Sequence, residues 1–394
     1  MSTNWAGNYA YGAARIHEPS SLDALRAIVV AAPRIRVLGS RHSFNDIADS
    51  LELVSLRGLP ADVAVGDGAV SFSGGLTYGD LASCGVALHN LASLPHISVA
   101  GAVATATHGS GDGNGNLATA VRELELLTSA GELVRVRRGD PDFDGMVVGL
   151  GALGVVTRLT LDAEPEFAVR QRVWEDLPWE TLFASFDAIT SAAYSVSLFT
   201  RWGPTVEQVW LKSRSALPEE CFGARPAARE LHPIRELDPV NTTPQRGASG
   251  PSWERLPHFR MGFTPSNGDE LQSEYLLPRD AAVPALQALR GIAGVIAPAL
   301  QVSEIRTVAA DALWMSTAYG RDSVALHFTW KPEPIDHVLT AVESALAPFD
   351  PRPHWGKLFL RAPRYERQDD FLALRERLDP RGAFVNDWLA RVLG

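Results

Sequence analysis

The sequence predicts a protein of mixed helices and strands in at least two parts, and three observations support this. The chain has 394 residues, which corresponds to two or three domains of ordinary size. Hydrophobic residues make up 46% and charged residues 21%, a balance typical of folded globular proteins. The residue pattern also changes near position 165, from short apolar runs between glycine-rich turns to a segment with more Trp and Phe.

The first part, residues 1 to about 165, is expected to alternate short strands with helices. A helix is predicted over residues 20–32, because serine stands at its start and apolar residues recur at helical spacing from Leu22 to Val29. The run RIRVLGS, which ends at residue 40, is predicted to be a strand that leads into a turn. Further strands are expected over residues 69–75 and 132–138.

The second part, residues 166 to about 350, predicts longer strands and helices. Helices are expected over residues 178–194 and 280–294. Strands are expected over residues 194–202, 207–213, 271–278, 302–310 and 323–330. Residues 214–260 are rich in Pro, Arg and Glu without a clear period, and they predict a long irregular segment. The tail from residue 351 is expected to be ordered and to contain a helix.

Composition excludes several classes of function. The net charge of −10 argues against a nucleic-acid-binding protein and against attachment to anionic membranes. Two cysteines are too few for a disulfide framework or a four-cysteine zinc site. The N-terminus has no apolar signal-peptide region, and the longest apolar stretch, residues 291–300, is too short to span a bilayer. We therefore expect a cytoplasmic protein without a membrane partner.

The glycine motif at residues 149–154, GLGALG, matches the spacing of a dinucleotide-binding fingerprint but lies in the wrong context. Such a fingerprint needs a strand before it and a helix after it. Here a β-branched, strand-like run follows the motif, so we interpret it as a glycine turn that enters a strand. Metal-protease, P-loop and G-x-S-x-G motifs are absent from the sequence, which leaves metal catalysis and serine hydrolysis without support.

Two segments of the first part are candidates for ligand binding. The run GSRHSFN (39–45) follows a predicted strand, and such a turn can expose successive backbone N–H groups to an anion. Its histidine, His42, would in isolation be read as an ordinary loop residue. Residues 100–115 contain almost no large side chains, which would let the backbone approach a ligand closely. A flexible surface loop is the alternative, but the apolar run ISVAGAVATA favours a buried ligand-binding loop.

Two strand-like segments of the second part carry polar residues on one face. Alternation places Glu304 and Arg306 on the same face of one strand. In the other, Val324 to Trp330 supply an apolar face, which leaves His327 and Thr329 together on the opposite side. Adjacent strands of this kind would form one polar surface, although each strand alone could equally be a solvated sheet face. The run HWGK (354–357) adds a histidine and a lysine nearby in sequence.

Taken together, these segments resemble the vanillyl-alcohol-oxidase type of flavoproteins, and within it the bacterial alditol oxidases. The resemblance spans nearly the whole chain. The segments that carry it, in order, are GSRHSFN, NLASLPHISVAG, ATATHGSG, GALGVVT, AAYSVSLFT, ELQSEYLLP, EIRTVAAD, HFTW and RPHWGK.

The resemblance implies an α+β flavoprotein of two domains. Residues 1–165 would form an FAD-binding domain, and residues 166–350 a cap domain with an antiparallel sheet. Residues 351–394 would return to the FAD domain and the active site. The family is expected to use FAD, here bound covalently through His42, although Arg41 stands where the family motif has glycine. The implied partners are a polyol and O2, and we expect a monomer.

The resemblance also implies the site residues. The residues expected around FAD are Val37, Leu38, Gly39, Ser40, Arg41, His42, Ser43, Ser93, Ser98, Gly101, Thr105, Ala106, Thr107, His108, Val155 and His354. The residues expected to bind the substrate are Ser93, Glu304, Arg306, Thr329 and Lys357. The residues expected to take part in catalysis are Arg306, Lys357 and His327.

Those residue types suit the oxidation of an uncharged polyol. Glu304 would accept hydrogen bonds from hydroxyls, Arg306 and Lys357 would donate them, and Ser93 and Thr329 would do either. The positive charges would stabilise a developing alkoxide, and His327 is a candidate proton acceptor. The expected reaction converts the terminal hydroxyl of xylitol or sorbitol to the aldose and reduces O2 to hydrogen peroxide. The alternatives are a sugar-1,4-lactone oxidase or dehydrogenase and a catalytically silent flavin-binding protein.

Overall fold

The computed structural model describes residues 2–263 and 270–394. Its α-helices are α1 Leu22–Ala31, α2 Tyr78–Leu81, α3 Val99–Ala104, α4 Phe143–Val147, α5 Trp179–Ala184, α6 Phe186–Thr190, α7 Ala282–Gly291, α8 Ala293–Ile296, α9 Asp336–Leu346, α10 Gln368–Leu378 and α11 Asp387–Leu393. Its strands are β1 Arg15–His17, β2 Ile35–Val37, β3 Glu52–Val54, β4 Val63–Gly66, β5 Ala69–Ser73, β6 Val86–Ala87, β7 Val121–Leu127, β8 Leu133–Arg137, β9 Val155–Asp162, β10 Glu164–Pro165, β11 Ala168–Pro178, β12 Ser195–Thr200, β13 Thr205–Ser213, β14 Arg225–Pro226, β15 Arg246–Pro251, β16 Leu271–Pro278, β17 Leu300–Val308, β18 Ser323–Trp330 and β19 Arg352–Pro353.

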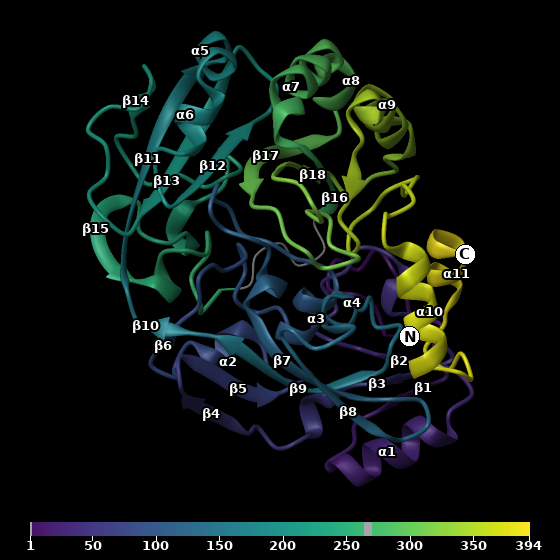
Figure 1. The fold of residues 1–394 in the computed structure, drawn as a ribbon. Helices are drawn as coiled ribbons and strands as arrows, with labels where there is room; N and C mark the ends of the chain where they lie inside the picture. Colours follow the sequence, from purple (N-terminus) through teal and green to yellow (C-terminus); the bar gives the residue numbers. More distant parts are fainter. Residues whose placement is uncertain (1, 264–269) are drawn as a thin grey trace.

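In the described residues, the N-terminal half of the chain builds three small sheets, which lie in the lower part of Figure 1. The smallest pairs β6 with β10 antiparallel. Strands β1, β3 and β2 form a parallel sheet in that order. Strands β4, β5, β9, β7 and β8 form an antiparallel sheet in that order. The turn at Gly149–Gly154 leads directly into β9, as the sequence predicted for the GLGALG motif.

A larger antiparallel sheet occupies the upper part of Figure 1. In the described part of the chain its order is β14-β11-β13-β12-β17-β18-β16-β19, and β15 pairs with β11. Helices α5 to α9 cover its outer face (Figure 1). The apolar side chains of β18 that alternation predicted, Val324, Leu326, Phe328 and Trp330, pack beneath them in one hydrophobic core. The opposite face of β18 is therefore left for polar side chains.

The C-terminal segment joins the two halves. Strand β19 pairs with β16 of the large sheet. Helices α10 and α11 then lie beside the N-terminal half (Figure 1), where the Ile35 N–H donates to the Ala383 carbonyl at 2.8 Å. Ser21 caps α1 by accepting from the Ala24 N–H at 3.2 Å, as expected of the serine at that position.

The structure differs from the sequence prediction in four places. The helix expected over 280–294 is divided into α7 and α8 at Ile292. The helix expected over 178–194 is divided into α5 and α6 at Ser185, whose φ of −136° leaves the helical region. The stretch of small residues expected to be a loop contains helix α3, because its apolar positions pack into the core. The segment 214–260, expected to be irregular, contains strand β15, which pairs with the edge of β11.

No helix among residues 2–263 and 270–394 is long and apolar enough to cross a membrane. The helices α9 and α10 have 11 residues each, about half the length that a bilayer requires.

A buried arginine holds several segments of the N-terminal half together. Arg36, on β2, is 2% exposed, and its guanidinium donates to three backbone carbonyls. These belong to Ile47, to Leu150 in the glycine turn at 2.6 Å, and to Phe384 in the C-terminal segment at 3.0 Å. Burial lowers the pKa of Arg36 to about 10, so the side chain stays charged at neutral pH.

We predict that Arg36→Met lowers the free energy of unfolding by about 3 kcal/mol, because three buried carbonyls lose their donor. Exposed Arg34, two residues earlier, supplies the control, and Arg34→Met should change stability by less than ~0.5 kcal/mol. Urea unfolding followed by tryptophan fluorescence measures both. Equal effects of the two substitutions would contradict the structural role of Arg36.

Candidate active site

A cavity of about 330 Å³ lies between the small sheets and the large sheet, and segments far apart in the sequence line it. The N-terminal half contributes the loop 37–44 and parts of the segment 92–108. Strands β16, β17 and β18 contribute polar side chains from the large sheet, and the C-terminal segment contributes residues 354, 356 and 357. The predicted ligand loops and the predicted polar sheet face therefore meet in one place.

His42 lies on the cavity wall in the loop that follows β2. Its ring stacks on Trp5, with centroids 5.0 Å apart and an interplanar angle of 21°. Within the described residues, neither ring nitrogen has a hydrogen-bond partner. Burial lowers the pKa of His42 to about 4, so the imidazole is neutral at physiological pH. A buried polar group that has no partner within the protein is suited to bind a ligand in the cavity.

The loop around His42 is fixed from both sides. The Trp5 N–H donates to the Arg41 carbonyl at 2.8 Å, and the Phe44 N–H donates to the Gly356 carbonyl at 2.7 Å. Arg41 adopts a φ of +64°, a left-handed conformation that favours glycine. The backbone fits the glycine that the resemblance led us to expect at this position. Arg41 keeps the glycine-like backbone at some cost in strain, and its guanidinium donates to Ser2 Oγ at 2.7 Å.

The small residues let two segments of the cavity wall approach closely. The Ser98 N–H donates to Ser40 Oγ at 2.9 Å. A Cβ atom added at Gly39 or at Gly101 would lie 2.5 Å from Ser98 Oγ, closer than a Cβ atom approaches a non-bonded heavy atom. Glycine at both positions therefore keeps the loop after β2 and helix α3 in contact at the cavity wall.

Most residues expected around the cofactor line the cavity. They are Val37, Leu38, Gly39, Ser40, Arg41, His42, Ser43, Ser93, Ser98, Gly101, Thr105, Thr107, His108 and His354. Ala106 and Val155 are not among its lining residues. Ala106 packs in the core of the N-terminal half, and Val155 packs in the core beneath α1. Because side chains alternate along β9, Val156 lines the cavity instead of Val155.

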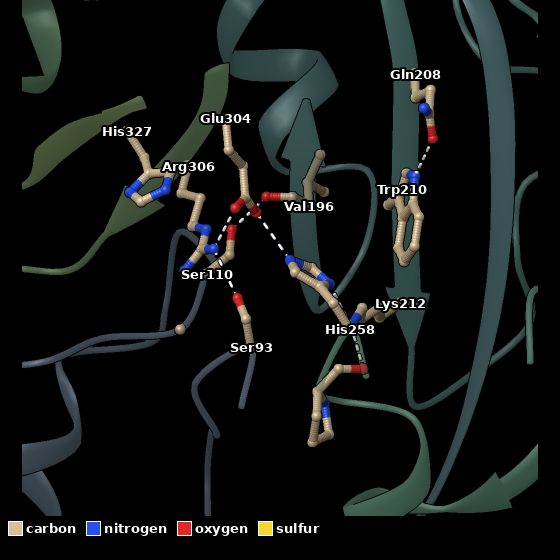
Figure 2. Close-up of polar contacts among 12 residues, drawn as sticks. Ser93, Ser110, Val196, Gln208, Trp210, Lys212, His258, Glu304, Arg306 and His327 are labelled. Atoms are coloured by element: carbon tan, nitrogen blue, oxygen red, sulfur yellow. Dashed lines mark hydrogen bonds and ion pairs between the residues drawn. The ribbon is translucent and has the colours of Figure 1, made fainter. Parts of the chain in front are cut away.

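The polar face predicted on β17 and β18 is present. The two strands pair antiparallel, with Glu304 directly opposite His327. Glu304, Arg306, His327 and Thr329 all line the cavity. Arg306 donates to Ser93 Oγ at 2.8 Å and also contacts Glu304, which ties the large sheet to the N-terminal half (Figure 2).

Glu304 is an ionised carboxylate although it is buried. Burial alone would raise the pKa of Glu304, but the charge of Arg306 and a hydrogen bond from His258 hold it well below its usual range. His258 Nε2 lies 2.8 Å from Glu304 Oε1 (Figure 2). The pKa of Arg306 is raised in turn, because the attraction of Glu304 outweighs burial.

Lys357 forms a second charged group with Glu274 and His327. Its Nζ lies 2.8 Å from Glu274 Oε2 and 2.7 Å from His327 Nδ1. Burial lowers the pKa of Lys357, and Glu274 opposes that shift. Burial and the charge of Lys357 lower the pKa of His327 to about 4. Lys357 therefore donates to a neutral His327, whose Nε2 lies 3.1 Å from Thr329 Oγ1.

The comparisons with known proteins agree with this arrangement. A family model described as an FAD binding domain matches residues 13–137, and one described as D-arabinono-1,4-lactone oxidase matches residues 267–392. An alditol oxidase of Streptomyces sp. is 50% identical over 99% of this chain and 98% of its own length. The chain belongs to the alditol oxidase family of FAD-linked oxidoreductases.

More distant relatives also align with this chain over its whole length. An L-gulono-1,4-lactone dehydrogenase of Mycobacterium tuberculosis is 29% identical over 100% of this chain and 99% of its own. The crystal structure of a cholesterol oxidase from B. sterolicum superposes with a TM-score of 0.76 at 15% identity, covering 100% of this chain and 96% of that one. That likeness shows the shared fold: an FAD-binding domain and a domain built on an antiparallel sheet.

The cavity fits the FAD that the family implies. The unpartnered nitrogens of His42 and the close-packed glycines at residues 39 and 101 lie on the wall formed by the FAD-binding domain. The ionised side chains come from the other parts of the lining: Glu274 from β16, Glu304 and Arg306 from β17, and Lys357 from the C-terminal segment. Within residues 2–263 and 270–394, no group of three or more His, Cys, Asp or Glu residues is arranged to hold a metal ion.

Sequence reasoning did not identify Glu274, His258 and Lys212. Glu274 was discoverable, because Gln272 and Glu274 lie two residues apart on β16 and share one face by the argument used for β17. His258 was not, since it lies in the aperiodic segment before residue 260. Lys212 lies on β13, whose pattern alone shows no partner for it.

We predict that stability falls as the pH is lowered from about 6.5 to 4. The pKa values of His258 and His327 are about 4 in the folded protein, against about 6.5 for an unfolded histidine. The unfolded chain therefore binds more protons in this interval, and each histidine lowers the free energy of unfolding by up to ~1.4 kcal/mol per pH unit. Urea unfolding at pH 7, 6 and 5 measures the slope. His258→Gln should make it shallower, and a flat profile between pH 7 and 5 would contradict the assignment.

Proposed function

We propose that this protein oxidises the terminal hydroxyl of alditols such as xylitol and sorbitol to the aldose, with O2 as the electron acceptor and hydrogen peroxide as the second product. The observation that carries the proposal is the paired polar wall, on which Glu304, Arg306 and Ser93 form one hydrogen-bonded group and Lys357, Glu274 and His327 form another. The 50% identity to an alditol oxidase supports the same substrate class.

The charges on this wall suit a neutral substrate. Glu304 is balanced by Arg306, and Glu274 is balanced by Lys357, so the wall offers many donors and acceptors with little net charge. A polyol can satisfy such groups along its length with one hydroxyl after another. An alcohol without these hydroxyls would leave buried polar groups unpaired, which costs binding energy.

The residues on this wall also account for the chemistry. When bound, FAD supplies the redox step by accepting a hydride from the substrate carbon. Arg306 and Lys357 stabilise the negative charge that develops on the substrate oxygen. His327 can take the hydroxyl proton at Nδ1 only after Lys357 turns its N–H away, because that nitrogen already accepts from Lys357 at 2.7 Å. The proton transfer therefore involves Lys357 and His327 as a pair.

Lactone oxidation is the second candidate, because the lactone oxidase family model matches residues 267–392. Both readings use the same fold and the same FAD-binding domain. They differ in the substrate that best satisfies the polar wall.

We predict that xylitol and sorbitol give the highest kcat/KM, with glycerol well behind and lactones and simple alcohols near background. A short alcohol leaves Glu304 without a hydroxyl to bind, and loss of a hydrogen bond to a charged group costs roughly 10- to 100-fold. A peroxidase-coupled assay measures each substrate and detects peroxide directly. A lactone with a higher kcat/KM than xylitol would overturn the substrate assignment, and reduction of the flavin without reoxidation by O2 would indicate a dehydrogenase.

We also predict that FAD is covalently bound to His42. The ring lies on the FAD-binding side of the cavity with both nitrogens unpartnered, and its pKa of about 4 leaves a neutral imidazole that can form a bond. Acid denaturation followed by gel electrophoresis should leave flavin fluorescence on the protein band. His42→Ala should release all flavin on denaturation and lose most of its oxidation rate. His337→Ala, at an exposed position on α9, should keep the flavin fluorescence on the protein band and the wild-type rate. Complete release from the wild type would contradict the linkage.

A further inference from the structure

The use of lysine in this chain is uneven. The sequence contains 33 arginines and three lysines. Lys331 is exposed, and Lys357 belongs to the active site described above. The third, Lys212, is 1% exposed on β13 and has no role in the proposed reaction as described above.

Lys212 lies behind His258 as seen from the cavity. Its Nζ donates to the carbonyls of Leu256 and Pro257, the latter at 3.1 Å, and lies 3.2 Å from His258 Nδ1. Figure 2 shows the resulting line from Lys212 through His258 to Glu304 and Arg306. His258 and Glu304 line the cavity, whereas Lys212 is not among its lining residues. Any effect of Lys212 on a substrate is therefore transmitted through His258.

Hydrogen-bond counting fixes the protons along this line. The Glu304 carboxylate only accepts, so His258 Nε2, 2.8 Å away, carries a proton. A neutral imidazole has one N–H, so His258 Nδ1 must accept, and the donor facing it is Lys212. The carbonyls of Leu256 and Pro257 take two further protons of Lys212, so all three N–H groups of an ammonium are used.

The electrostatics agree with this count. Burial and the charge of Lys212 lower the pKa of His258 to about 4, which keeps the ring neutral. Burial lowers the pKa of Lys212 well below its usual value, and the negative charge of Glu304 opposes that shift. The three acceptors around Lys212 Nζ, which are the carbonyls of Leu256 and Pro257 and His258 Nδ1, favour the ammonium against the effect of burial.

The ring of His258 has little freedom to turn. Trp210 packs edge-on against it at 5.1 Å, and Phe199 does so at 5.5 Å. Glu304 is consequently held at both oxygens: Oε1 accepts from His258 and Oε2 contacts Arg306. Glu304 also lines the cavity, where a substrate hydroxyl can reach it.

We propose that Lys212 and His258 are positioning residues for substrate binding: the Lys212 ammonium fixes His258 as the Nε2–H tautomer, and this N–H holds the Glu304 carboxylate ionised and aimed at a hydroxyl of the polyol. The inference rests on the proposed function, because it assigns Glu304 to the substrate. It goes beyond it by giving a role to a lysine that does not touch the substrate.

The test uses the FAD-containing enzyme and pairs of variants. Lys212→Met removes the ammonium, and Lys331→Met is the matched control at the exposed lysine. His258→Phe removes the N–H that faces Glu304. His258→Gln keeps an N–H for Glu304 and an oxygen that accepts from Lys212. If Lys212→Met fails to fold, His258→Phe and His258→Gln still test the proposal, because both variants keep Lys212.

We expect Lys212→Met and His258→Phe to raise the KM for xylitol roughly 10- to 100-fold, with a smaller change in kcat, because they loosen a charged hydrogen-bond acceptor of the substrate. His258→Gln and Lys331→Met should keep a KM close to the wild-type value. A purely structural role would lower the melting temperature of the Lys212 and His258 variants without this split between KM and kcat. A wild-type KM in Lys212→Met or in His258→Phe would overturn the proposal.

A second readout does not depend on activity. In the ¹⁵N-histidine spectrum of the FAD-containing enzyme, the His258 signals are identified by their loss in His258→Gln. We expect the Nε2–H tautomer in the wild type and its loss or mixing in Lys212→Met. An Nδ1–H tautomer or a charged ring in the wild type would overturn the inference. If the wild type oxidises neither xylitol nor sorbitol, the proposed substrate fails, and this spectrum still decides whether Lys212 fixes His258.

Discussion

Three neighbouring strands of the large sheet place Glu274, His327 and Glu304 side by side in one row, since each carboxylate lies opposite His327 in the strand register. Two ionised carboxylates so close together in a buried site need cations and N–H donors on every side. Arg306 and Lys357 supply the charges, and His258 supplies a further donor. The requirement explains why polar side chains from so many segments converge on this one part of the cavity.

One of those cations, Lys357, is also connected to the loop that carries His42. Lys357 enters the site from the C-terminal segment, where Asn45 Nδ2 donates to the carbonyls of Trp355 and Lys357 at 2.9 and 2.8 Å. Asn45 belongs to the loop that carries His42. A shift of that loop would therefore move Lys357 relative to Glu274, so the positions of His42 and of the Lys357 charge depend on each other.

Alternation along single strands was enough to predict that Glu304 and Arg306 share a face and that His327 and Thr329 share another. The same rule applied to β16 would have added Glu274. It could not have found His258, because an irregular segment has no period from which a side-chain direction follows. It also could not have separated Val155 from Val156 at the cavity wall, since that depends on which face of β9 the helix α1 covers. The break between α5 and α6 is likewise unmarked in the sequence, since residues 179–190 contain no Gly or Pro.

The placement of the lysines has a practical side for surface chemistry. Arginine supplies 33 of the 36 basic Lys and Arg side chains of this protein, so primary amines are rare on its exterior. Among the lysine side chains, an amine-directed reagent would meet Lys331, just beyond the end of β18, whereas Lys212 is enclosed and Lys357 faces the cavity. Attachment to a solid support or a label through Lys331 would thus fix most molecules in one orientation and leave the residues around the flavin untouched.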